Sequence, residues 1–109
     1  MQPYIYMSIG VRGDGLEEKQ LEKLKEITAE DYYYADGCAE DEKLFVFETL
    51  YSPWDYEAFS ASKTIDSDVV VRLANNSKSK ILDYQNLLKK EGLAHLVDRV
   101  KIVIHTTEL

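Results

Sequence analysis

The chain has 109 residues, 45% of them hydrophobic, which is enough to bury a single core without metal or disulfide staples. Its 20 acidic and 13 basic residues give a net charge of −7, which opposes binding to nucleic acid or anionic membranes and favours a basic partner. The lone cysteine, Cys38, excludes an internal disulfide, and no Cys/His cluster has the spacing of a zinc site.

The first half of the chain predicts a strand, a helix and a hairpin. Residues 4–11 alternate between apolar and other side chains, which is the period of a half-buried strand. A turn at 12–15 follows, and residues 16–28 place leucines at helical spacing among charged residues. Residues 31–35 and 43–51 are rich in aromatic and β-branched side chains, so they predict an antiparallel hairpin with a long acidic loop.

The second half predicts two helices and two strands. A serine, a proline and an acid at the start of residues 52–62 match the capping-box spacing, so a helix is expected there. The run DVVVRL at 68–73 predicts a strand, and 78–91 predicts a helix that ends at the following glycine. Residues 93–97 form a short packed turn in this interpretation, and the alternation over 99–106 predicts the last strand.

This order of elements, β-α-β-β-α-β followed by α-β, predicts the α+β class. We expect a split βαβ, ferredoxin-like sheet, antiparallel or mixed, with helices on one face and an extra C-terminal helix and strand. The other face is then open. The side chains expected on or beside that face are Tyr4, Tyr6, Phe45, Phe47, Arg72 and Lys101.

The chain shows no internal repeat, low-complexity tract or Pro/Gly-rich linker, which predicts one compact domain over residues 1–109. Its N-terminus lacks the pattern of a secretory leader, and no run of eighteen apolar residues occurs. We therefore expect a soluble, cytoplasmic protein with no membrane contact.

The stretch DYYYADGCAEDE, residues 31–42, is the most unusual part of the sequence. Three consecutive tyrosines alternate faces in a strand, so at least one points outward in any register. A second aromatic and acidic group follows at 51–57, and exposed aromatic side chains are common in binding hot spots. We expect partner contacts from Asp31, Tyr32, Tyr33, Tyr34, Asp36, Glu40, Asp41, Glu42, Tyr51, Trp54, Asp55, Tyr56 and Glu57. In the alternative interpretation the aromatics pack in the core and the acids only keep the surface soluble.

Catalytic and metal chemistry find no support in the pattern. The many carboxylates offer several acid/base pairs, but nothing selects one of them. Cys38 sits among acids, which would raise the pKa of its thiol, and the loop 36–42 lacks the calcium-loop pattern. Gly10, Gly13 and Gly15 lack the spacing of a nucleotide-binding loop, so we assign them to turn geometry. We expect no enzyme activity, no metal and no cofactor.

Two stretches, IYMSIG and KLFVFETL, loosely resemble the two signature strands of RNA-recognition-motif domains. The resemblance implies an open sheet face on which aromatic side chains stack single-stranded bases. The chain departs from that pattern at Leu44 and Val46, where glycines are expected, and its acidity opposes phosphate binding. Nucleic acid therefore stands only as an alternative partner.

Our leading hypothesis is a small acidic, non-enzymatic binding protein that occludes a basic surface of a protein partner, such as a nuclease or another nucleic-acid-binding protein. Toxin-immunity proteins and phage inhibitors of defence nucleases are classes with this charge and size. One alternative is a ligand-sensing or small enzymatic domain that uses the open sheet with His95 or His105 and Arg72. Another is a homodimer formed through an uncovered face or edge.

Overall fold

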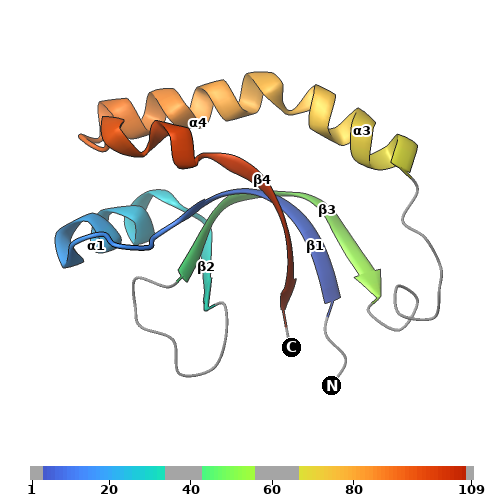
Figure 1. Cartoon of the computed structure of the whole chain (residues 1–109), viewed down its shortest axis with the longest axis horizontal. Helices are drawn as coiled ribbons and strands as arrows, with labels where there is room; N and C mark the ends of the chain where they lie inside the picture. Colours follow the sequence, from blue (N-terminus) through green and yellow to red (C-terminus); the bar gives the residue numbers. More distant parts are fainter. Residues whose placement is uncertain (1–3, 34–42, 56–66, 108–109) are drawn as a thin grey trace.

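The architecture is taken from a computed structural model, which describes residues 4–33, 43–55 and 67–107 (Figure 1). The elements in chain order are β1 (Tyr4–Arg12), α1 (Glu18–Ile27), β2 (Glu30–Tyr33), β3 (Lys43–Asp55), α3 (Ser67–Asn76), α4 (Lys78–Lys90), the 3₁₀ helix η1 (Ala94–Arg99) and β4 (Lys101–Thr107). Among these described helices, none has the length and apolar content needed to cross a membrane.

Four strands form the sheet within the described residues, and every neighbouring pair is antiparallel. The order is β2-β3-β1-β4, so β3 lies between β1 and β2, and β1 lies between β3 and β4. Each helical connection therefore leads to a strand that is parallel to the one before the connection, with one antiparallel strand between the two. This arrangement confirms the predicted α+β class with an antiparallel sheet and helices.

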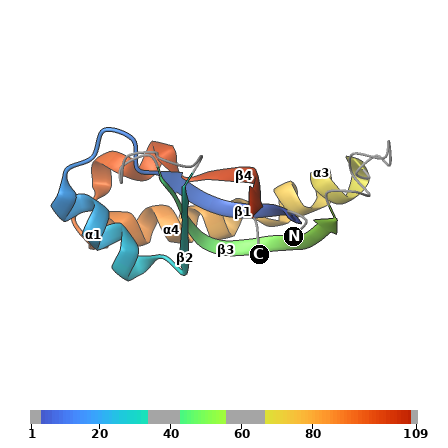
Figure 2. The ribbon, with the colours of Figure 1, turned by 90° about the horizontal axis from the view of Figure 1, so that it is seen from below.

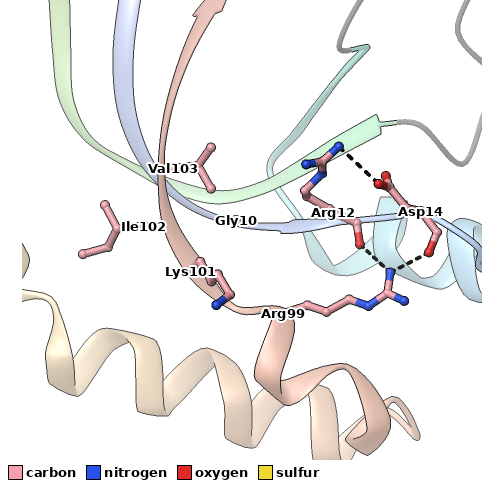
Figure 3. Close-up of a pocket in the computed structure, with 7 residues that line it drawn as sticks. All are labelled: Gly10, Arg12, Asp14, Arg99, Lys101, Ile102 and Val103. Carbon is pink, nitrogen blue, oxygen red and sulfur yellow. Dashed lines mark hydrogen bonds and ion pairs between the residues drawn. The ribbon is translucent and has the colours of Figure 1, made fainter.

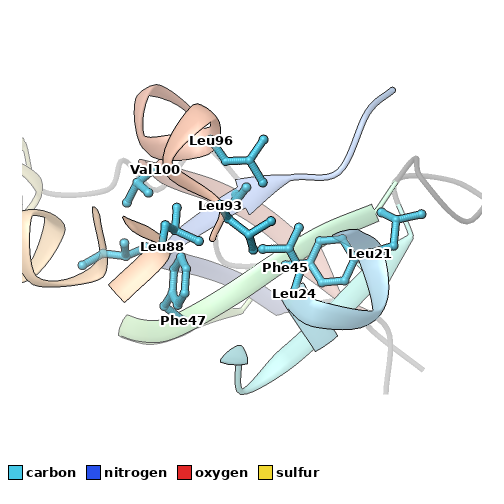
Figure 4. Close-up of a cluster of buried hydrophobic side chains, with 10 residues drawn as sticks. Leu21, Leu24, Phe45, Phe47, Leu88, Leu93, Leu96 and Val100 are labelled. Carbon is cyan, nitrogen blue, oxygen red and sulfur yellow. The ribbon is translucent and has the colours of Figure 1, made fainter. Parts of the chain in front are cut away.

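The hydrophobic core lies between one face of the sheet and three of the helices (Figure 4). Alternate residues of β1 and β3 point into it, because successive side chains of a strand face opposite sides. α1, α4 and η1 supply leucines at helical spacing, and each fully buried Leu or Phe stabilises the fold by about 1.5–3 kcal/mol. The buried members are Ile9, Val11, Leu21, Leu24, Phe45, Phe47, Leu88, Leu93, Leu96 and Val100.

The second face of the sheet differs from the sequence-based expectation. Figure 2 looks onto this face, with β1, β3 and β4 in front of α4 and α3. Phe45 and Phe47 do not lie on it, because they are buried in the core at 0% and 6% exposure. Arg72 does not lie on it either, since it belongs to α3. Among the side chains that the structure describes, this face carries Tyr6 and Lys101, and neither phenylalanine of β3 is there to stack a base.

The predicted strand at 68–73 is wrong, because these residues belong to helix α3. Three consecutive valines favoured a strand. However, Val70, Ala74, Ser77, Ile81 and Tyr84 recur at spacings of four and three along α3 and α4, and all are at least partly buried. This helical stripe decides the conformation, because burial of an amphipathic face outweighs weak intrinsic preference. The sheet therefore has no extra strand at this position.

The predicted helix at 52–62 is also wrong where the structure describes it. β3 continues to Asp55, with Trp54 opposite Ile5 of β1. The pairing of β1 with β3 shifts between Ile5 and Met7, and Pro53 lies at that shift. A proline is tolerated there because a bulge leaves one backbone N–H without a ladder bond. Residues 56–62 lie outside the described part of the chain.

Other predicted boundaries agree with the structure to within a few residues. The turn after β1 contains Gly15 at φ +76°, and Gly92, two residues after the end of α4, has φ +79°. Glycine adopts this conformation at a lower cost than L residues do. Leu93 N then donates to Leu88 O at 2.8 Å, which closes the last turn of α4. Gly10 is an exception, since it lies inside β1 and not in a turn.

Candidate functional site

The residues expected to contact a partner fall into two groups on the two strands of the hairpin. Asp31, Tyr32 and Tyr33 lie in β2, beside the start of β3, with Tyr33 opposite Lys43. The remaining described members are in the last part of β3, which pairs with the start of β1. The members of this second group are Tyr51, Trp54 and Asp55, while Tyr34, Asp36, Glu40, Asp41, Glu42, Tyr56 and Glu57 lie outside the described residues.

The two groups stand at opposite ends of β3. Eight residues separate Lys43 from Tyr51, which in a strand corresponds to roughly 26 Å. The sequence left open whether the hairpin would bring the second group close to the first strand. The register places its described members beside Tyr4 and Ile5 of β1, so the described backbone positions of the two groups lie at different ends of β3.

Asp31 has a partner within the chain. Lys43 Nζ donates to Asp31 Oδ2 at 2.7 Å, and the Lys43 side chain is buried. A buried ammonium needs a nearby carboxylate, because its desolvation is otherwise uncompensated. Asp31 therefore has a structural task at the edge of the sheet, which the sequence alone did not reveal.

The net charge of the protein is divided unevenly along the chain. Residues 34–42, 55–66 and 108 contain eight of the 20 acids and only one of the 13 basic residues. The twelve acidic and twelve basic residues left are those whose side chains the structure describes, and their charges cancel. The whole excess of −7 is thus carried by Asp55 at the end of β3, the segments that join β2 to β3 and β3 to α3, and Glu108.

Polar side chains of β1 and β4 meet on the second face of the sheet. Ser8 Oγ and His105 Nε2 share a hydrogen bond of 2.8 Å, and the Tyr6 and His105 rings stack at 5.7 Å between centroids. Burial lowers the pKa of His105, and the negative charge of Glu30 opposes part of that shift. Ser8 is fully buried, so its hydroxyl is closed to a substrate and the pair is not a nucleophile and base.

A pocket of about 310 Å³ lies at the end of β1 and the start of β4 (Figure 3). This volume is at the lower end of the range of about 300–1,000 Å³ typical of small-molecule sites. Its wall exposes more apolar than polar surface. The lining residues are Gly10, Arg12, Asp14, Arg99, Lys101, Ile102 and Val103.

The charged groups of the pocket are arranged by backbone contacts as well as by ion pairs. Arg99 Nη1 donates to the carbonyl oxygens of Arg12 and Asp14 at 3.1 and 2.7 Å. Arg12 Nη2 contacts Asp14 Oδ2 at 3.1 Å, and Figure 3 shows both arginines converging on Asp14. These bonds tie the start of β4 to the turn that follows β1.

The pocket is not evident from the amino-acid sequence. Arg12 and Asp14 were assigned to a turn, and Arg99 to the start of a strand 87 residues later. Only the pairing of β1 with β4, in which Gly10 faces Lys101, brings these residues together. A sequence signal for such a pairing does not exist within either segment, because register depends on contacts between them.

Metal binding gains no support from the described residues, among which no three His, Cys, Asp or Glu side chains gather closely enough to hold an ion. Comparison of the chain with protein-family models, with curated proteins and with solved structures gives no match. Function is therefore argued from the charge distribution and from the geometry of the sheet.

Proposed function

We propose that the chain is a small acidic, non-enzymatic binding protein that covers a basic surface of a protein partner, in the manner of an inhibitor or immunity protein. The division of charge supports this function. A scaffold whose charges cancel carries segments with a large acid excess, and the four acids of residues 36–42 stand directly after three tyrosines. Such segments attract a cationic partner over a distance and offer aromatic anchors on contact.

The scaffold that presents these segments is, in our interpretation, ferredoxin-like. Its strand order β2-β3-β1-β4 interleaves two β-α-β units, one built from β1 and β2 and the other from β3 and β4. The segment 34–42 leaves β2 and enters β3 at one end of the sheet, and the segment after Asp55 leaves β3 at the other end. A basic partner would meet one or both of these ends.

A nuclease, or another protein that binds nucleic acid, is the partner that this chemistry fits. Such proteins expose Lys and Arg surfaces that neutralise phosphates, and an acidic protein can occupy the same surface. In this proposal, electrostatic attraction brings the basic partner to the acidic segments. The affinity of the interaction should therefore depend strongly on salt, unlike an interface dominated by apolar burial.

The experiment is a calorimetric titration of the chain with a basic nuclease at low and high salt. The affinity at about 1 M salt should be about tenfold lower, or more, than at about 0.1 M salt, because the Debye length falls from ~10 to ~3 Å. Replacing Asp36, Glu40, Asp41 and Glu42 by their amides should weaken binding by a similar factor at low salt. Inhibition of the nuclease should fall in parallel.

The matched control removes the same number of charges from the scaffold. Glu18, Glu22, Asp83 and Asp98 are exposed, and changing them to amides alters the net charge equally. This control should lose much less affinity than the loop variant. Binding that is independent of salt, or equal losses in the two variants, would contradict the proposal. A parallel titration with a single-stranded oligonucleotide tests the nucleic-acid alternative, which predicts binding at low salt.

A further inference from the structure

The described residues that line the pocket between β1 and β4 carry a net charge opposite to that of the whole chain. Arg12, Arg99 and Lys101 supply three positive charges and Asp14 one negative charge, an excess of two. This excess is surrounded by a wall that is mostly apolar. Apolar surroundings lower the local dielectric constant and strengthen the attraction of a buried anion to nearby cations.

Arg99 is held in place before any ligand arrives. Its Nη1 group uses both hydrogens on the carbonyl oxygens of Arg12 and Asp14. A guanidinium has five N–H groups, so three remain on Nη2 and Nε. In the part of the chain that the structure describes, these three donate to no protein acceptor. A fork of fixed donors is suited to a planar or tetrahedral oxyanion, because little side-chain entropy is lost on binding.

Lys101 adds a second cation that is available to a ligand. Its side chain is exposed and makes no ion pair with a described residue, although it stands opposite Gly10 on the neighbouring strand. Gly10 lines the pocket with backbone alone, because a Cβ atom there would lie 2.8 Å from the backbone oxygen of Phe45 on β3. Val103 follows Lys101 on the same face of β4 and supplies apolar surface, as Figure 3 shows.

We propose that this pocket binds a small organic anion with a compact apolar body and one carboxylate or phosphate head group. The head group lies against Arg99 and Lys101, and the body covers Gly10 and Val103. The site is separate from the acidic segments of the proposed function and does not depend on them. A ligand that fits a pocket of this size has on the order of ten non-hydrogen atoms and binds in the millimolar range.

The test is an NMR titration of the full ¹⁵N-labelled chain with benzoate, phenyl phosphate and benzyl alcohol. Benzoate should shift the amide signals of Gly10, Lys101 and Val103 most. Benzyl alcohol has the same body without the charge and should bind about tenfold more weakly. The stronger of benzoate and phenyl phosphate identifies the preferred head group, and either order supports an anion site.

A charge reversal at Lys101 and a matched reversal elsewhere complete the test. Lys101→Glu should weaken benzoate binding about tenfold. The variant should still fold, because the Lys101 side chain is exposed. Lys78→Glu makes the same change in net charge on the exposed surface of α4 and should leave binding within about twofold. The proposal is overturned if the pocket amides do not shift, if benzyl alcohol binds as well as benzoate, or if the two lysine variants behave alike.

Discussion

The two faces of strand β1 are both buried in the middle of the strand but are chemically different. On the helix side, Ile9 and Val11 are fully buried in the hydrophobic core. On the other side, Ser8 and Gly10 are buried as well, yet they bring a hydroxyl and a bare backbone in place of apolar side chains. The comparison teaches that burial along one strand can serve two purposes, since one face stabilises the fold and the other shapes a surface.

The difference arises from what lies across each face. The helix side is covered by leucines of α1, α4 and η1, which only apolar side chains can match. On the other side, the polar contact of Ser8 with His105 and the close approach of Gly10 to β3 determine the geometry. Mutations on the two faces should therefore change stability for different reasons. Those on the helix side remove apolar contacts, and those on the other side cause steric overlap or change a titrating group.

The largest effect is expected on the helix side, from Phe45→Ala. Phe45 is completely buried, so removing its ring should lower the free energy of unfolding by about 3–5 kcal/mol. The measurement is urea denaturation followed by circular dichroism. Val71→Ala on α3 is the control, because Val71 is 56% exposed and should change stability by less than about 0.5 kcal/mol. Equal losses in the two variants would show that the core is not where the structure places it.

The elements of this core were largely predictable from the sequence, because local periodicity marks them. The alternation around Ile9 and Val11 identifies β1, and the spacing of Leu21 and Leu24 identifies α1. Both patterns arise within a few residues, so no knowledge of distant partners is needed. The same applies to α4, whose end is marked by Gly92.

Helix α3 was missed because two local signals disagree. The valines of 69–71 have β propensity, whereas the partly buried stripe from Val70 through Ser77 to Leu88 has helical spacing. The stripe becomes evident only when α3 and α4 are considered together. Ser77 lies between the two helices and donates from Oγ to Leu73 O at 2.6 Å, which links the start of α4 to α3.

The pocket could not be predicted because it depends on pairing between the two ends of the chain. Arg12 and Arg99 become neighbours only after β4 joins the edge of β1. The role of Gly10 is hidden for the same reason, since its constraint comes from Phe45 and Leu44 on another strand. Sequence patterns identify elements better than they identify the contacts between elements.

The second prediction concerns Gly10→Ala, on the face opposite the core. A Cβ atom at Gly10 would lie 2.8 Å from the backbone oxygen of Phe45 and 3.0 Å from Leu44 Cδ1. The backbone of β3 would have to move, and overpacking of this kind costs about 1–3 kcal/mol. Thermal unfolding should therefore show a lower midpoint than in the wild type.

Gly15→Ala separates this steric effect from a backbone effect. Nothing lies within 4 Å of a Cβ atom at Gly15, but its φ of +76° disfavours any L side chain, at a cost of roughly 1 kcal/mol. The Gly15 variant should leave the amide signals of Phe45 and Leu44 in place, whereas the Gly10 variant should shift them. A Gly10→Ala protein as stable as the wild type would mean that β3 yields at this point without cost.

The smallest effect is expected from the titration of His105 on the same face. Burial lowers the pKa of His105 in the folded protein below its ordinary value, while the unfolded chain keeps that value. The unfolded state therefore binds the proton more readily. Stability from this site is fully present above about pH 6.5 and is lost as the pH falls through the folded pKa of His105.

A comparison of His105→Gln with the wild type isolates this contribution from the carboxylates, which also titrate at low pH. Between about pH 7.5 and pH 5, the unfolding midpoint of the variant should fall less than that of the wild type. His95→Gln makes the same substitution at an exposed position that is hydrogen-bonded to Gln20, and it controls for the loss of an imidazole in itself. If the His105 variant follows the wild type, the contact between Ser8 and His105 accommodates the imidazolium, which would contradict the prediction.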